Sequence, residues 1–278
     1  MLGQDLVRVL RAAGHEVKAW DIGQCDVTRP ERVRAALEGS RPALVFHCAG
    51  YTDVDGAEAD PAAAMGVNGE GTAHVAEACR AVGAGLVYIS TDYLFDGSSR
   101  TPYREEDPVH PLNAYGRSKL TGEDAVRAAH LENAWIIRTA WLYGAGGRNF
   151  VQAILDRAGQ GHPLQVVTDQ EGSPTYTMDL AGALGRIPKG VPPGTYHVTN
   201  AGSTTWFAFA RAILDRAGMR ETPVHPIATP ASGRPAIRPA YSVLANEKWA
   251  LATGAPLRPW PAALDAFLSA LAPPVRRR

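Results

Sequence analysis

The sequence predicts an α/β fold in which a parallel sheet is covered by helices on both faces. Two observations indicate this: short apolar runs rich in β-branched residues alternate with segments of helical periodicity, and 278 residues are enough for one large domain or two smaller ones. Hydrophobic residues make up 45% of the chain and charged residues 20%, as in ordinary globular proteins. Such alternation implies right-handed crossovers between parallel strands.

The first 143 residues carry the clearest alternation. Leu2, Leu6 and Leu10 lie on one helical face, which predicts a helix over 2–13 with Gly14 as its C-cap. The elements expected after it are a strand at 16–20, a helix at 30–37, a strand at 43–50, a helix at 61–82, a strand at 85–90, a helix at 112–129 and a strand at 134–139.

Beyond residue 143 the pattern is looser and proline becomes frequent from 223 to 274. Helices are expected near 149–158, 176–186 and 204–217, and strands at LQVV (164–167) and YHVT (196–199). We expect a main domain over 1–143, to which 164–180 and 195–217 return, with LQVV and YHVT joining the main sheet. Residues 144–163 and 218–278 would form a smaller, discontinuous cap that ends in a solvated Arg276–Arg278.

Charge and cysteine usage exclude several classes of protein. Lys and Arg number 28, as do Asp and Glu, so the basic footprint of a nucleic-acid-binding protein is absent and a small ligand is favoured. Cys25, Cys48 and Cys79 form no C-x-x-C pair, which predicts free thiols and a cytoplasmic location. No apolar stretch approaches the ~18 residues of a membrane span. No zinc-ligand spacing or P-loop occurs, so no metal is expected, and His47 beside Cys48 is interpreted as core.

A tyrosine and a lysine form the first candidate for chemistry. Of nine tyrosines only Tyr115 has a lysine, Lys119, four residues on, and these positions share one face of a helix. An ammonium beside a phenol favours the ionised phenol, which suits a general acid or base. An exposed helical pair is the alternative. Thr91 strengthens the first interpretation because it follows a predicted parallel strand, where ligands bind in open α/β sheets.

Several longer motifs carry a family resemblance. STDYLFDG at 90–97, YGRSK at 115–119 and RTAWLYG at 138–144 occur together with HCAGYTDVDGAEAD at 47–60, VTDQEGSPT at 167–175 and RPAYSVL at 238–244. As a set they resemble the extended short-chain dehydrogenases/reductases, and most closely the dTDP-4-dehydrorhamnose reductase family. The resemblance implies a Rossmann-like doubly wound sheet with a substrate-binding cap. It also implies NADPH- or NADH-dependent reduction of the 4-keto group of a nucleotide-linked 6-deoxysugar, dTDP-4-dehydro-L-rhamnose first among them.

The resemblance assigns roles to the reacting residues. Tyr115 would donate the proton to the keto oxygen, Thr91 would hydrogen-bond that oxygen, and Lys119 would bind the nicotinamide ribose and lower the pKa of the tyrosine. Asp92 and Trp141 would face the sugar, and Arg238 would grip the nucleotide sugar. The alternative for Trp141 is an aromatic residue that lines the core, and the alternative for Arg238 is a surface ion pair.

The same resemblance implies a set of residues near the cofactor. Asp21 would accept a hydrogen bond from the adenine ribose, which favours NADH without excluding NADPH. Asp26 and Val27 would flank the adenine, although Asp26 capping a turn before Pro30 is an equal alternative. The remaining expected contacts are Leu2 and Gly3 at the first helix and Ala49, Gly50 and Tyr51 after the strand at 43–50.

The glycine fingerprint of a dinucleotide fold is incomplete in this sequence. A first strand normally leads into G-x-x-G-x-x-G, whose amides receive the pyrophosphate, whereas here Gly3 alone fits, as the last glycine. We therefore expect Met1 to be an internal residue of the fingerprint and the natural protein to begin about ten residues earlier, with a strand of about five to six residues.

Three other functions are weighed against reduction. Sugar 4,6-dehydratases carry Asp-Glu after the threonine, where this chain has Asp92 and Tyr93, so simple reduction is favoured. Epimerisation needs a further base, for which His110 alone is available at the end of an expected substrate-covering loop. A non-catalytic, cofactor-sensing subunit, like the regulatory subunit of methionine adenosyltransferase, stays open because of the incomplete fingerprint. A monomer or homodimer without nucleic-acid or membrane partners is expected.

Overall fold

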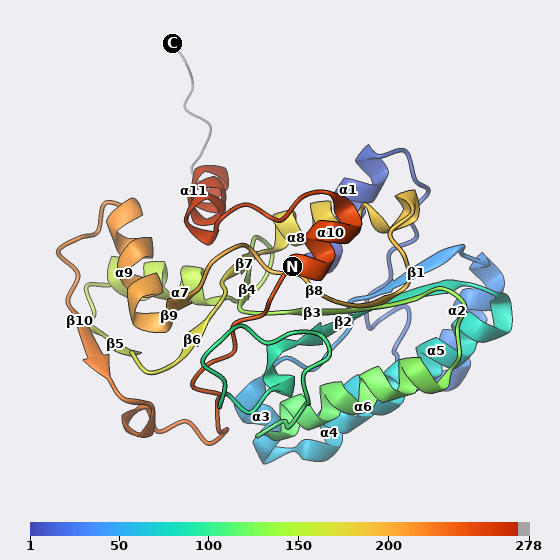
Figure 1. The fold of residues 1–278 in the computed structure, drawn as a ribbon, viewed down its shortest axis with the longest axis horizontal. Coiled ribbons are helices and arrows are strands. Elements are labelled where there is room, and N and C mark those ends of the chain that lie inside the picture. Colours follow the sequence, from blue (N-terminus) through green and yellow to red (C-terminus); the bar gives the residue numbers. More distant parts are fainter. Residues whose placement is uncertain (272–278) are drawn as a thin grey trace, which may run out of the picture.

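The centre of the molecule is a four-stranded parallel sheet in the order β1-β2-β3-β8. The computed structural model describes residues 1–271, so Arg276–Arg278 lie outside the described residues. The strands are β1 (Leu44–His47), β2 (Gly85–Thr91), β3 (Ala134–Thr139) and β8 (Gly194–His197), and each was expected from the sequence. Their parallel pairing and the helices above and below them in Figure 1 confirm the predicted fold class.

Helices cover both faces of this sheet. On one face lie α1 (Leu2–Ala12), α8 (Thr177–Leu184) and α10 (Glu247–Thr253), and on the other α2 (Pro30–Ser40), α5 (Gly71–Val82) and α6 (Ala114–Ala128) (Figure 1). Alternate residues of β2 supply the two cores: Val87 packs with α1 and α8, and Leu86 and Tyr88 pack with α2, α5 and α6. A strand buried on both sides reads as a continuous apolar run, which is how β2 was recognised in the sequence.

The segment between β1 and α5 is more divided than the sequence suggests. The helix expected over 61–82 consists of α4 (Pro61–Met65), the π-helical turn η1 (Gly66–Glu70) and α5, and it is preceded by α3 (Val54–Ala59). Asp53 caps α3 and Asp60 caps α4, each by accepting a hydrogen bond from a backbone amide three residues on. After β2 the 3-10 turn η2 (Asp92–Leu94) leads into a long loop that ends at α6.

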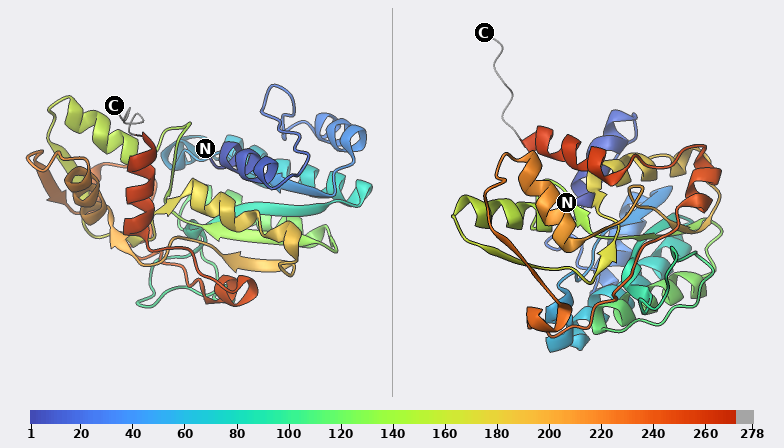
Figure 2. Two further views of the ribbon diagram at one scale, coloured as in Figure 1. Left: turned by 90° about the horizontal axis from the view of Figure 1, so that it is seen from above. Right: turned by 60° about the vertical axis from the view of Figure 1, so that its left-hand side comes forward.

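The cap forms a second core beside the sheet. It contains α7 (Phe150–Gly159), β5 (Leu164–Val167), α9 (Trp206–Arg216), β10 (Val224–Ile227) and α11 (Trp260–Leu271), which stand apart from the main sheet in Figure 2. β5 pairs with β10, so the expectation that LQVV joins the main sheet is wrong, whereas YHVT does join it as part of β8. Gln165 of β5 is exposed between buried Leu164 and Val166, a one-sided pattern that suits a small surface sheet.

Two short strand pairs connect the sheet with the cap. β4 (Leu142–Tyr143) pairs with β7 (Thr175–Tyr176) in parallel, and β6 (Glu171–Gly172) pairs with β9 (Thr204–Thr205) in antiparallel fashion. In the other direction, α10 comes from the expected cap segment 218–278 but packs on the main sheet through Trp249. The described chain therefore passes between the two cores more often than the sequence suggests.

The strand expected at 16–20 is absent. Residues 15–20 carry no regular structure, and Trp20 is 40% exposed. A strand exists through its ladder, and within residues 1–271 no strand pairs with this segment, since β1 hydrogen-bonds to β2 alone. The helix expected over 2–13 is confirmed as α1, with Gly14 in the left-handed region at φ 86°. No helix within the described range has the length and apolar character needed to cross a membrane.

Candidate active site

The carboxyl ends of β2 and β3 place the predicted catalytic residues. Thr91 is the last residue of β2 and pairs in register with Thr139, the last residue of β3. Helix α6, which packs on β2, carries Tyr115 and Lys119 on one face and is capped by Asn113, whose side chain accepts a hydrogen bond from the Gly116 amide. Because α6 begins next to the end of β2, its first turns lie at the edge where open α/β sheets bind ligands.

Lys119 is a buried cation at this edge. The residue is 5% exposed, and Nζ donates a hydrogen bond of 2.6 Å to the backbone oxygen of Ile89. Burial lowers the pKa of Lys119 to about 7, against the opposing effect of Glu123 and Cys48, which raise it. An ammonium has three donors, so two N–H groups are available beyond the bond to Ile89.

Tyr115 differs from expectation in its pKa. Burial raises the pKa of the phenol to about 12, Thr91 partly offsets this by hydrogen bonding, and the charge of Asp92 raises the pKa further. The expectation that Lys119 lowers the pKa of Tyr115 is wrong: the pKa is raised, chiefly because a phenolate is costly in a desolvated site, and the one lowering contribution comes from Thr91. Tyr115 is therefore protonated at neutral pH, the form that a proton donor requires.

Thr91 and Asp92 form a connected pair. The Thr91 hydroxyl donates to Asp92 Oδ1 at 3.1 Å, and the Ser242 hydroxyl donates to Asp92 Oδ2 at 2.6 Å. Burial raises the pKa of Asp92 to about 6, and the hydrogen bonds from Ser242 and Thr91 act against this. Sequence reasoning missed Ser242, although RPAYSVL was singled out, because a buried serine carries no distinguishing pattern.

Arg238 lies in a bidentate ion pair. Its Nη1 and Nη2 atoms donate to Asp55 at 3.0 and 2.8 Å, and Arg234 donates to the same carboxylate at 2.9 Å. The Asn113 side chain also donates to the backbone oxygen of Ile237. Arg238 therefore does form an ion pair, but its side chain is 11% exposed, so the pair is largely buried and not the surface pair that was expected as the alternative. The pair joins α3 to the carboxyl-terminal segment. Contact of Arg238 with substrate stays a prediction.

Trp141 has a strained backbone and an aromatic partner. Its φ is 46°, in the left-handed region that costs a bulky residue energy. The ring stacks on Trp206 of α9, with centroids 3.5 Å apart and planes 7° apart, and a Cβ at Gly172 would contact the Trp141 ring. Trp141 is thus held between β6 and the cap, two residues after β3 ends. Sequence reasoning did not find Trp206, which lies more than 60 residues away.

The amino-terminal residues expected at the cofactor lie close to the end of β1. Gly3 in the first turn of α1 faces the Cβ of Cys48, while Leu2 is buried in the core. Ala49 and Gly50 are exposed after β1, and Tyr51 is fixed by two hydrogen bonds with the Asn68 side chain, of 2.8 and 3.0 Å. The amides of the first turn of α1 have no side-chain cap. An uncapped helix N-terminus next to a strand end suits a diphosphate, and the buried Lys119 suits a ribose, so these residues fit a dinucleotide.

The residues expected near the adenine of the cofactor lie in the segment between α1 and α2. Asp21 is exposed and accepts a hydrogen bond from the Gly23 amide, in a turn rather than after a strand. The Asp26 carboxylate accepts hydrogen bonds from both the amide and the hydroxyl of Thr28, so its turn-capping alternative is confirmed. Val27 packs against Gly71 of α5. Contact of these three residues with a cofactor stays a prediction.

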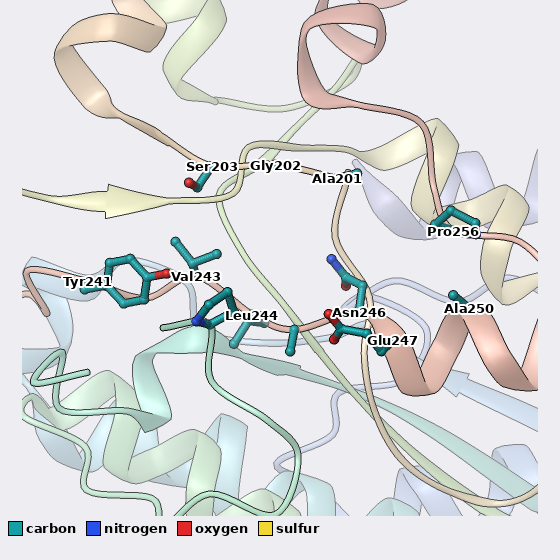
Figure 3. Close-up of a pocket in the computed structure, with 12 residues that line it drawn as sticks. Ala201, Gly202, Ser203, Tyr241, Val243, Leu244, Asn246, Glu247, Ala250 and Pro256 are labelled. Carbon is teal, nitrogen blue, oxygen red and sulfur yellow. The ribbon is translucent and has the colours of Figure 1, made fainter. Parts of the chain in front are cut away.

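A separate pocket of 340 Å³ lies between residues 201–203 and the segment 241–247 (Figure 3). Tyr241 and Val243 line this pocket (Figure 3). The hydroxyl of Ser242, between them in the sequence, instead donates to Asp92. None of the residues expected at the catalytic or cofactor site lines this pocket.

The doubly covered parallel sheet with Thr91, Tyr115 and Lys119 at its carboxyl edge has the arrangement of the extended short-chain dehydrogenases/reductases. The chain belongs to the family described as RmlD substrate binding domain, whose model matches residues 1–272. It is 46% identical over 276 residues to the dTDP-4-dehydrorhamnose reductase of Streptomyces griseus, covering 98% of this chain and 91% of the relative.

Further relatives and solved structures agree. A probable dTDP-4,6-dihydroxy-2-methyloxan-3-one 4-ketoreductase of Streptomyces antibioticus is 48% identical over 285 residues, covering 100% of this chain and 96% of the relative. The crystal structure of dTDP-4-dehydrorhamnose reductase from Bacillus anthracis in complex with NADP superposes with a TM-score of 0.93 at 37% identity, covering 97% of this chain and 95% of that one.

Proposed function

We propose that the protein reduces the 4-keto group of a dTDP-linked 6-deoxysugar, converting dTDP-4-dehydro-L-rhamnose to dTDP-L-rhamnose with NADPH or NADH. One observation carries the proposal: the end of β2 and the start of α6 bring Thr91, Tyr115 and Lys119 to one edge of the sheet. The near full-length similarity to a reductase of this name supports the substrate.

Each residue has a distinct part in this reaction. The bound nicotinamide supplies a hydride to the carbonyl carbon. Tyr115, protonated at neutral pH, donates its proton to the carbonyl oxygen. The Thr91 hydroxyl, whose single proton is donated to Asp92 Oδ1 in this structure, turns to donate to the same carbonyl oxygen when the substrate binds. Lys119 holds the cofactor ribose with the two donors that Ile89 leaves available, and its charge stabilises the phenolate left after proton transfer. Asp92, Trp141 and Arg238 are proposed at the sugar nucleotide.

The cofactor contacts are part of the same proposal. Gly3 and the first turn of α1 would receive the diphosphate together with Ala49 and Gly50. Asp21, Asp26 and Val27 would lie on the adenine side, where the exposed carboxylate of Asp21 would favour NADH without excluding NADPH. The main domain and the cap described above would hold cofactor and sugar respectively. We place the enzyme in the cytoplasm, as a monomer or homodimer.

The test measures the oxidation of NADPH and of NADH by dTDP-4-dehydro-L-rhamnose, monitored as the loss of absorbance of the reduced nicotinamide. We expect turnover by the wild type and at least a hundredfold less by Tyr115→Phe, which keeps the ring and loses the proton. Tyr143→Phe is the matched control, because this buried tyrosine of the second core has no hydrogen-bond partner for its hydroxyl among the described residues and no place in the proposed chemistry. Equal rates for wild type and Tyr115→Phe would refute the proposal and favour a cofactor-sensing subunit.

The sugar itself needs a second comparison. The relatives include a dTDP-4-keto-6-deoxy-D-glucose reductase of Streptomyces niveus, 39% identical over 264 residues. Comparing kcat/KM for the two 4-keto sugars decides between these substrates. A larger value for the rhamnose precursor is expected, and a larger value for the D-glucose derivative would overturn that choice while keeping 4-ketoreduction.

A further inference from the structure

The Lys119 ammonium is stabilised by few charges. It is buried, and burying an ammonium is costly unless other groups stabilise its charge. The titratable groups that face it are Glu123 on α6, Cys48 after β1, and His47 on β1. The pKa of His47 is lowered to about 3, first by burial and then by the charge of Lys119, so its imidazole is neutral at neutral pH.

An aromatic ring lies directly against this cation. The Nζ atom of Lys119 is 4.2 Å from the centroid of the Tyr88 ring, well inside the ~6 Å range of a cation–π interaction. Tyr88 is on β2, one residue before the Ile89 carbonyl that accepts the Lys119 hydrogen bond, and it is fully buried. Carbonyl and ring together hold the ammonium from the side of the sheet.

The position of the ring is fixed from several sides. The Tyr88 hydroxyl is within hydrogen-bond distance of the backbone oxygens of Asn68 and Lys119, at 3.4 and 3.3 Å. The ring stacks on His47 with centroids 5.7 Å apart, and a Cβ at Gly122 would overlap the Tyr88 hydroxyl. Glycine at 122 thus leaves the room that the ring needs.

We propose that Tyr88 is a positioning residue of the cofactor site, whose ring face holds the Lys119 ammonium in its charged form and in place. The inference rests on the proposed function in assigning Lys119 to the nicotinamide ribose. Two N–H groups of Lys119 remain for the ribose hydroxyls, and loss of the ring weakens both the charge and its placement. Tyr88 itself touches neither sugar nor cofactor in this scheme.

The direct test is the titration of Lys119 in the cofactor-free, full-length protein. The chain has four lysines, so NMR of protein labelled at lysine Cε gives a simple spectrum, and Lys119→Met identifies the signal of Lys119. Tyr88→Leu is expected to lower the pKa of Lys119 by about 0.5 to 1 unit, because the charged form loses the ring. Tyr88→Phe keeps the ring face and is expected to leave the pKa within about 0.2 units of wild type.

Two further variants make the result decisive. Tyr196→Leu removes another buried tyrosine, whose ring lies 5.5 Å from the Lys248 ammonium, and it should not move the pKa of Lys119. Incorporation of pentafluorophenylalanine at position 88 keeps the ring shape and removes its negative face, so it should lower the pKa as Tyr88→Leu does. This variant decides the question if Tyr88→Leu does not fold. An unchanged pKa of Lys119 in the fluorinated protein would overturn the proposal.

Cofactor affinity separates this inference from the proposed function. Tyr88→Leu is expected to weaken NADPH binding by about two- to tenfold, measured by titration without substrate, whereas Tyr88→Phe should bind as wild type does. A lowered pKa with unchanged NADPH affinity would refute the role at the cofactor. Failure of the wild type to reduce the sugar would refute the proposed function instead, since neither titration contains substrate.

Discussion

The Asp92 carboxylate accepts a hydrogen bond of 2.6 Å from the hydroxyl of Ser242, a residue 150 positions further along the chain. This bond joins the end of β2 to the carboxyl-terminal segment in the interior of the protein. We expect Ser242→Ala to lower the free energy of unfolding by about 2 kcal/mol at pH 8, where Asp92 is ionised, and by less at pH 5, where it is largely protonated. Urea unfolding at both pH values checks this, and an equal loss at the two would contradict it. Ser269→Ala removes an exposed hydroxyl and should cost less than about 0.5 kcal/mol.

The raised pKa of Asp92 has its own effect on stability. Because burial moves the pKa from 3.8 to about 6, the native state binds more protons than the unfolded state between these values. The free energy of unfolding of the wild type should therefore fall as the pH rises from about 4 to about 6. Asp92→Asn has no carboxyl group to titrate at this position. The difference in free energy of unfolding between the wild type and Asp92→Asn should therefore change by about 3 kcal/mol over this range. If the free energies of unfolding of the wild type and of Asp92→Asn, measured by denaturation, change in parallel between pH 4 and pH 7, this prediction is wrong.

The Asp55–Arg238 ion pair should contribute measurably to stability. Arg238 has an 11% exposed side chain and bonds Asp55 with two donors, whereas Arg234, which bonds the same carboxylate, is 61% exposed. A double-mutant cycle with Asp55→Asn and Arg238→Met is expected to give a coupling of about 1 to 2 kcal/mol. The same cycle with Arg234→Met should give less than about 0.5 kcal/mol, because solvent screens the exposed pair. Equal couplings would show that burial does not distinguish the two arginines.

The pH dependence of this ion pair has the opposite sign to that of Asp92. Hydrogen bonds and charge from Arg238 hold the pKa of Asp55 below its ordinary value, in spite of burial. Its contribution is complete above the pKa of an unfolded aspartate and is lost as the pH falls through the lowered value. The stability difference between wild type and Asp55→Asn should therefore shrink in acid. A difference that grows on acidification would show that the pKa shift has the wrong sign.

The stacked Trp141–Trp206 pair predicts a spectroscopic signal and a kinetic effect. Rings 3.5 Å apart and 7° from parallel should couple in the near-ultraviolet circular dichroism. Trp206→Leu should abolish that signal and raise the KM for the sugar nucleotide several-fold, while NADPH affinity stays unchanged, because Trp206 supports Trp141 from the cap side. Trp249→Phe, in the sheet core, is the control and should retain the signal. If Trp206→Leu loses the circular dichroism signal but keeps the KM of the wild type, the stacked pair has no part in substrate binding and the prediction is wrong.

A buried ion pair supports α6 behind the catalytic residues. Glu123 is fully buried and accepts two hydrogen bonds of 2.9 Å from Arg138 of β3. Glu123→Gln leaves a buried guanidinium without its counter-charge and should cost about 3 to 5 kcal/mol in thermal or urea unfolding. Asp124→Asn is the matched control, since Asp124 is 65% exposed and also pairs with Arg127; it should cost less than about 1 kcal/mol. Similar losses for the two variants would contradict the assignment.

The strands of the main sheet were predictable because burial on two faces leaves a continuous apolar run. β2 and β3 were located within one residue, and α1 and α6 within two. The segment 16–20 shows the limit of this reasoning, since its residues have strand composition but no ladder partner in the described chain. LQVV shows another limit: propensity identifies a strand, whereas its place in the fold depends on contacts with β10, some 60 residues away.

In the site, residues with a local signature were found and residues defined by distant contacts were not. The spacing of Tyr115 and Lys119 is visible in the sequence because one helix carries both. Ser242 and Trp206 act through partners 150 and 65 positions away, and Tyr88 looks like any other apolar strand residue. The pKa of Tyr115 was also beyond reach, because burial of the phenol depends on the complete fold.

The contacts of residues 236–242 set a rule for recombining this protein with its relatives. This short segment supplies Arg238 to Asp55, the Ile237 carbonyl to Asn113, and Ser242 to Asp92, all partners in the first half of the chain. A chimera that exchanges everything after β3 replaces three matched pairs at once, while one that exchanges only the cap core leaves them intact. A hybrid enzyme should therefore keep an intact active site when segment 236–242 and the first half of the chain come from the same parent.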